Sequence, residues 1–178
     1  MNTKAENICA IWELDESTVR TLRSLLYGSG PDNELLANFH PHITLANYPS
    51  IERNALMKYT HDYAAHTEAF RADFASVGLL SPQHLVCFPR MKGGLYENFV
   101  RYHECFDAQA DQWTSLHGGL YRPHVSLYSE GQGVTRQAIT RIQQNFSPFT
   151  GHVVALSLSL VKPDGFSILA TYPLLRAV

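Results

Sequence analysis

A seven-residue motif occurs twice in this chain and constrains its fold more than any other feature. Residues 39–45 read FHPHITL and residues 121–127 read YRPHVSL. Each copy has an aromatic residue, a basic-type side chain, Pro, His, a β-branched aliphatic residue, a hydroxyl residue and Leu. The two histidines, His42 and His124, lie 82 positions apart. A match of this length indicates an internal repeat of one supersecondary unit.

Hydrophobic periodicity predicts the same duplication in the secondary structure. The order is strand, helix, strand, helix and hairpin, followed by helix, strand, helix and hairpin, and the prolines of the two hairpin turns, Pro82 and Pro163, lie 81 positions apart. Alternating apolar residues predict strands at 8–14, 42–48, 70–80, 84–91, 124–129, 154–160 and 166–172, and helical spacing predicts helices at 19–26, 51–63, 95–106 and 138–146.

Hairpins imply antiparallel pairing, which argues against a doubly wound parallel sheet. We therefore predict an α+β fold with two pseudo-symmetric lobes of antiparallel sheet flanked by helices, and an active-site groove between the lobes. The whole chain, 1–178, is expected to be a single bilobal domain whose repeat halves span roughly 8–91 and 92–175.

Composition excludes several classes of protein. The 178 residues are 45% hydrophobic and 17% charged, so a core can form and global disorder is excluded. The net charge of -2 argues against binding duplex DNA by bulk charge. The N-terminal residues lack the apolar stretch of a secretory signal, and the longest apolar run, 153–161, is too short to span a bilayer.

The odd number of cysteines argues against a disulfide framework. Cys9, Cys87 and Cys105 are scattered, and we expect each to be a small buried or half-buried residue. A reducing, cytoplasmic location without membrane association follows as the expectation. We also expect a monomer.

The motif places polar and apolar side chains on opposite faces of a strand. Residues i and i+2 of a strand share a face. His42 and Thr44 therefore point to one side and Ile43 to the core, and the second motif repeats this with His124 and Ser126. If a pseudo-twofold axis relates the lobes, the two polar pairs converge on one groove.

Two facing imidazoles suit phosphodiester chemistry. Because the ordinary pKa of His is about 6.5, one ring can accept a proton while the other donates one, and each transfer accelerates the reaction roughly 10²–10⁴-fold. We take His124 as the general base on water and His42 as the general acid, although pseudo-symmetry leaves the reverse assignment open. Thr44 and Ser126 can donate hydrogen bonds to the phosphoryl oxygens. This scheme needs no metal and no cofactor.

Other side chains are candidate substrate contacts. His40 and Arg122 lie two residues before the histidines and share their face if the strands extend so far. Tyr128 shares a face with Ser126 and can stack on a base. Trp12 shares a face with apolar residues, which favours a position in the core.

The paired Pro-His-aliphatic-hydroxyl-Leu motifs resemble the signature of the 2H phosphoesterase superfamily, which includes the 2′-5′ RNA ligase-like proteins and cyclic nucleotide phosphodiesterases. The resemblance covers nearly the whole chain. It implies a bilobal α+β fold and hydrolysis of 2′,3′-cyclic phosphates on nucleotides or RNA ends, usually without metal. It also implies that His42, Thr44, His124 and Ser126 form the site, with a partner that is a small nucleotide or an RNA terminus carrying a cyclic or 2′-5′ phosphodiester.

Two alternatives use the same residues. The groove could hold a nucleotide or RNA end without turnover. A metal hydrolase using His40, His42 and His124 is less favoured, because no carboxylate is close in either motif to complete a common ligand set.

Overall fold

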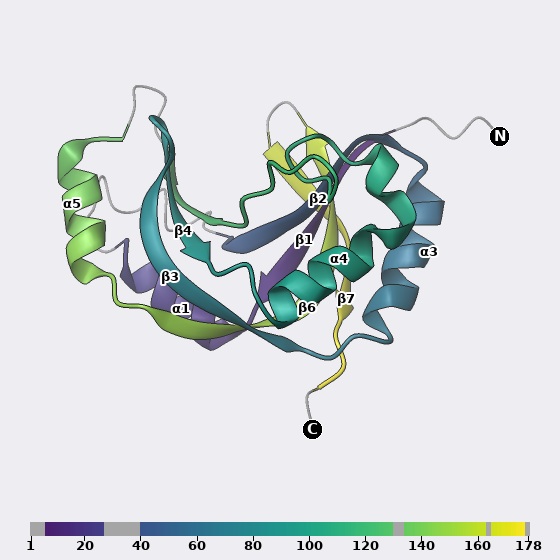
Figure 1. Ribbon diagram of the computed structural model, residues 1–178, viewed down its shortest axis with the longest axis horizontal. Coiled ribbons are helices and arrows are strands. Elements are labelled where there is room, and N and C mark those ends of the chain that lie inside the picture. Colours follow the sequence, from purple (N-terminus) through teal and green to yellow (C-terminus); the bar gives the residue numbers. More distant parts are fainter. Residues whose placement is uncertain (1–5, 27–39, 130–133, 163–164, 177–178) are drawn as a thin grey trace.

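The computed structural model describes residues 6–26, 40–129, 134–162 and 165–176. Phe39 of the first motif and Pro163 of the second hairpin turn lie outside these ranges. The described strands form one antiparallel sheet of order β2-β1-β6-β3-β4-β5, and β7 pairs with β6 (Figure 1). The strands are β1 (Glu6–Leu14), β2 (His42–Ile51), β3 (Phe70–Ser81), β4 (His84–Pro89), β5 (Val125–Ser129), β6 (Phe149–Lys162) and β7 (Gly165–Pro173).

The strand order is symmetric about its centre. Exchanging β1 with β4, β2 with β5 and β3 with β6 gives the same order read from the other edge. The strands form two groups, which we call the first lobe (β1, β2, β6 and β7) and the second lobe (β3, β4 and β5). The lobes are joined where Phe70–Phe74 of β3 pairs with Phe149–Val153 of β6. The predicted α+β class and antiparallel pairing are confirmed, whereas the repeat halves 8–91 and 92–175 stay a prediction.

The helices flank this sheet and begin at residues that cap them. Asp15 accepts a hydrogen bond from the amide of Thr18 at the start of α1, and Thr135 caps α5 in the same way. In Figure 1, α5 lies beside β3, and α3 lies at the opposite end of the molecule. The helices are α1 (Glu16–Ser24), α3 (Arg53–Ala64), α4 (Gly94–Phe106) and α5 (Arg136–Asn145), with a short 3-10 turn, η1 (Asp107–Gln109).

One core runs through both lobes. The apolar faces of the two motif strands belong to it, and Trp12 is fully buried, as the alternation predicts. Cys87 is buried and Cys9 half-buried, but Cys105 is exposed on α4, so the prediction for Cys105 was wrong. Among the described helices, none has the length and hydropathy that crossing a bilayer requires. A cytoplasmic location stays a prediction.

Candidate active site

The two motifs occupy equivalent places in the two lobes. His42 is the first residue of β2, and His124 immediately precedes β5. Both histidines are half-buried, whereas the proline before each and the aliphatic residue after each are buried. Thr44 is half-buried and Ser126 exposed. The motif strands thus carry their apolar residues into the core and leave the His-hydroxyl pairs accessible.

A β-bulge follows the hydroxyl residue in each motif. In the first lobe, the neighbouring residues Ala10 and Ile11 of β1 pair with Ala46 and Thr44 of β2, so β2 has one extra residue. In the second lobe, Leu85 and Val86 of β4 pair with Tyr128 and Ser126 of β5, so the extra residue recurs 82 positions later. A bulge bends its strand and re-aims side chains. The repeat seen in the sequence therefore extends to the irregularities of the backbone.

This bulge explains why Tyr128 does not lie beside Ser126. Strict alternation would place both side chains on the accessible face, but the extra residue reverses the alternation after Ser126. The Tyr128 side chain is 8% exposed and belongs to the core. The expectation that Tyr128 stacks on a base of the substrate is therefore corrected.

The rings of His42 and His124 each make an equivalent hydrogen bond to the backbone. The Nδ1 of His42 lies 2.8 Å from the backbone oxygen of His40, and the Nδ1 of His124 lies 2.8 Å from the backbone oxygen of Arg122. A carbonyl oxygen only accepts, so each Nδ1 carries the hydrogen and donates it. In each neutral ring, the other nitrogen, Nε2, is then the one that can take a proton.

The His42 ring lies within electrostatic reach of three charged groups. Burial lowers the pKa of His42, and the positive charges of His40 and His124 lower it further. The hydrogen bond to the His40 backbone and the negative charge of Glu13 act in the opposite direction. The net result is a lowered pKa, which favours the neutral ring of His42.

Residues of both motifs line one pocket between the lobes. The pocket has a volume of about 280 Å³, and its wall includes Thr44 of the first motif and His124 of the second, with Arg122 beside it. Arg122 is exposed. The remaining lining residues are Cys9, Asn47, Asp111, Trp113, Thr114 and Tyr121.

Glu13 joins this site, although sequence reasoning did not identify it. Glu13 of β1 pairs directly with His42 of β2. Its carboxylate lies 3.0 Å from the Nε2 of His40. Burial would raise the pKa of Glu13, but the hydrogen bonds from His40 and Ser157 and the nearby positive charge outweigh burial and lower it. The same interaction raises the pKa of His40. His40 is thus fixed by Glu13 at the edge of the site.

Two exposed aromatic residues near the histidines were also missed. Phe166, at the start of β7, has its ring centroid 5.8 Å from that of His42 and 6.0 Å from that of His40, and it is 48% exposed. Trp113 lines the pocket beside His124. Phe166 begins the strand predicted at 166–172, but alternation does not indicate which residues of other strands its ring contacts, and Trp113 lies in a loop.

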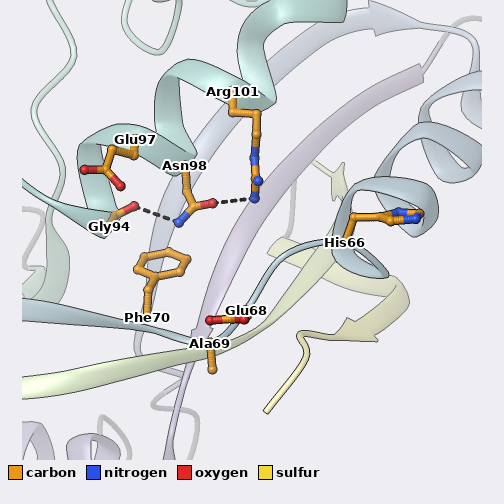
Figure 2. A pocket seen from close by; sticks show the side chains of 8 residues that line it. All are labelled: His66, Glu68, Ala69, Phe70, Gly94, Glu97, Asn98 and Arg101. Atoms are coloured by element: carbon orange, nitrogen blue, oxygen red, sulfur yellow. Dashed lines mark hydrogen bonds between the residues drawn. The ribbon is translucent and has the colours of Figure 1, made fainter. Parts of the chain in front are cut away.

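A larger pocket of about 440 Å³ shares no residue with this site (Figure 2). It lies where α4 packs over the beginning of β3. Figure 2 shows Arg101 and Asn98 of α4 turned toward each other. The Arg101 guanidinium donates to Asn98 and to Thr67, and it lies over the ring of Tyr63. Its guanidinium is thus already engaged by neighbouring side chains, so this pocket is a weaker candidate.

Within the described ranges, no group of three His, Cys, Asp or Glu side chains is arranged to hold a metal ion. The set of His40, His42 and His124 considered from the sequence therefore does not form such a group. His40 instead bonds to Glu13.

The fold is that of known phosphoesterases. No protein-family model and no curated protein matches the sequence. Solved structures do match. E. coli LigT complexed with phosphate has a TM-score of 0.59 at 13% identity, over 97% of this chain and 99% of LigT. A structure described as a phosphoesterase has a TM-score of 0.60 at 13% identity, over 97% of this chain and 99% of its own. E. coli LigT complexed with 3′-AMP has a TM-score of 0.57 at 14% identity, over 96% and 99%. The resemblance expected from the motifs is thereby confirmed at the level of the fold.

Proposed function

We propose that this protein is a 2H-type phosphoesterase that hydrolyses 2′,3′-cyclic phosphodiesters on nucleotides or RNA ends without a metal. The observation that carries the proposal is the matched hydrogen bonding of His42 and His124. Each ring donates from Nδ1 to the backbone oxygen two residues earlier, at 2.8 Å. Two rings with the same tautomer, each with Nε2 available, suit an acid and a base acting on one phosphate.

The lowered pKa of His42 supports its role as the general base. In the proposed reaction, Nε2 of neutral His42 takes a proton from water as the water oxygen attacks phosphorus. The bond from phosphorus to one ribose oxygen breaks, and Nε2–H of protonated His124 donates its proton to that oxygen. This assignment reverses the one first favoured from the sequence, where symmetry left both open.

The hydroxyls of Thr44 and Ser126 complete the proposed site. They follow the histidines by two residues in the two lobes and can donate to the non-bridging phosphoryl oxygens as charge develops. Arg122 lies in the same pocket wall as His124 and supplies a positive charge for the phosphate. In support, structures of the similar protein LigT have been solved with phosphate and with 3′-AMP.

The test measures hydrolysis of 2′,3′-cyclic mononucleotides, cyclic-phosphate RNA ends and 2′-5′ dinucleotides, with product identification. We expect His42→Ala and His124→Ala each to lower kcat/KM by at least 100-fold, with unchanged circular dichroism. His61→Ala is the matched control, since His61 is exposed on α3. Full activity in either site variant would refute the proposal, and activity lost on adding EDTA would refute the metal-free scheme. Measurable binding with no product in a single turnover would establish the binding-module alternative.

A further inference from the structure

The pocket beside His124 extends beyond the catalytic residues to an exposed tryptophan. Thr44, His124 and Trp113 all line this pocket. Trp113 is 60% exposed, whereas the chain's other tryptophan, Trp12, is fully buried. Single exposed aromatic residues are common on protein surfaces, so the position of Trp113 in the wall of this pocket is what carries the argument. Its indole is accessible to a ligand that binds there.

The loop that carries Trp113 is fastened to the first motif strand. The amide of Asp111 donates to the backbone oxygen of Asn47 at 2.8 Å, and the amide of Asn47 donates to the Thr114 hydroxyl at 2.9 Å. The Asn47 side chain also donates to the Asp111 carboxylate at 2.8 Å. Asn47 is three residues after Thr44 on β2. The position of Trp113 is therefore tied to that of the catalytic strand.

The Asp111 carboxylate is engaged both within the loop and with β2. One oxygen of the Asp111 carboxylate accepts from the amides of Trp113 and Thr114, at 3.1 and 2.9 Å, and from the Thr114 hydroxyl at 2.8 Å. The other oxygen accepts from Asn47. Asp111 therefore serves to fix the loop, and the exposed indole of Trp113 is accessible to a ligand.

Tyr121, which also lines this pocket, is held by contacts with Thr44 and Phe99. The Tyr121 hydroxyl donates to the backbone oxygen of Thr44 at 2.6 Å, and its ring stacks on Phe99 with the planes at 4°. A pocket of about 280 Å³ has space for one flat heterocycle beside the phosphate. Aromatic side chains bind bases by stacking, which tolerates different bases because every base has a π-face.

We propose that Trp113 is the base-binding residue of this site, so that the substrate class is phosphodiesters carrying a nucleobase rather than sugar phosphates alone. This inference rests on the proposed function. It adds that the base of the nucleotide stacks on Trp113 while its phosphate lies between His42 and His124.

Fluorescence tests the binding part independently of turnover. Trp113 is the exposed one of the two tryptophans, so 3′-AMP is expected to quench the emission of the protein, and ribose 3-phosphate is expected to leave it unchanged. Trp113→Phe should abolish the quenching, because only buried Trp12 remains. Quenching that survives in Trp113→Phe, or that ribose 3-phosphate matches, would overturn the inference.

Kinetics test the specificity part. We expect Trp113→Ala to lower kcat/KM for a nucleoside 2′,3′-cyclic phosphate about tenfold or more, and to leave hydrolysis of 1-O-methylribose 2,3-cyclic phosphate unchanged. Tyr96→Ala is the matched control, since Tyr96 is 50% exposed on α4 and is absent from the pocket wall. An equal loss for both substrates, or a change of oligomeric state in Trp113→Ala, would contradict the inference. Failure of the proposed function would look different, because the unmodified protein would hydrolyse neither substrate while 3′-AMP could still quench Trp113.

Discussion

Glu13 lies directly across the β1–β2 ladder from His42, and its carboxylate holds the neighbouring imidazole of His40. In the second motif, the position equivalent to His40 is occupied by Arg122, which carries a guanidinium in place of an imidazole. The two lobes thus present similar histidines in different electrostatic surroundings. In the proposed mechanism, this difference assigns the base to His42 and the acid to His124.

His40→Ala should move the acidic limb of the pH profile of kcat/KM to higher pH. The positive charge of His40 lowers the pKa of His42, and the variant removes it while leaving the Glu13 charge, which raises that pKa. The backbone oxygen that accepts from His42 remains. Because a general base must be deprotonated, a higher pKa of His42 demands a higher pH. His61→Ala should leave the limb in place, and a limb that moves down in His40→Ala would contradict the assignment of His42 as base.

Glu13→Gln should destabilise the protein most between about pH 4.5 and 6.5. The pKa of Glu13 is lowered from 4.5, so the stability that ionised Glu13 contributes is present above pH 4.5 and is lost as the pH falls through the lowered pKa. The pKa of His40 is raised from 6.5, so its contribution is present below that value and is lost as pH rises. The partly exposed pair should contribute about 0.5–1 kcal/mol to the free energy of unfolding. Urea denaturation at several pH values measures this, and a difference that does not vary with pH would argue against the pair.

Gly151→Ala should weaken the junction of the two lobes. Gly151 pairs with Ala72 in the β3–β6 ladder, and a Cβ there would collide with the side chain of Thr18. The Thr18 hydroxyl also accepts from the His152 amide at 3.1 Å, so it cannot move freely. We expect a loss of about 1–3 kcal/mol, measured by chemical denaturation. Gly78→Ala is the control, because its Cβ would make an ordinary 3.6 Å contact. Equal effects of the two changes would show that this collision does not occur.

Tyr121→Phe should reduce activity and stability together. The variant removes the hydroxyl that donates to the Thr44 backbone oxygen while keeping the ring stacked on Phe99. A lost hydrogen bond of this kind costs about 0.5–1.5 kcal/mol. Because the bond ties the second motif to the first, kcat/KM should also fall several-fold. Unaltered kinetics with the expected loss of stability would show that this tie does not position Thr44.

The sequence was sufficient to predict the parts of the site that follow strand alternation. His42 and Thr44 lie where a period of two places them, and the antiparallel hairpins identified the α+β class. Tyr128 was misplaced because a β-bulge adds one residue, and nothing in the local composition marks it. Glu13 was missed because its role depends on which residue of another strand pairs with it, and a single sequence does not specify that register. Trp113 depends on a loop whose conformation is set by contacts with Asn47, far away in the chain.

The ladder between β3 and β6 has a consequence for how the protein loses its structure. β6 pairs with β1 of the first lobe and, over Phe149–Val153, with β3 of the second lobe. The two lobes therefore share one continuous sheet. This ladder joins the lobe that carries His42 to the lobe that carries His124. If the proposed function is correct, the site cannot unfold separately from the sheet, and hydrolysis and circular dichroism should be lost at the same denaturant concentration.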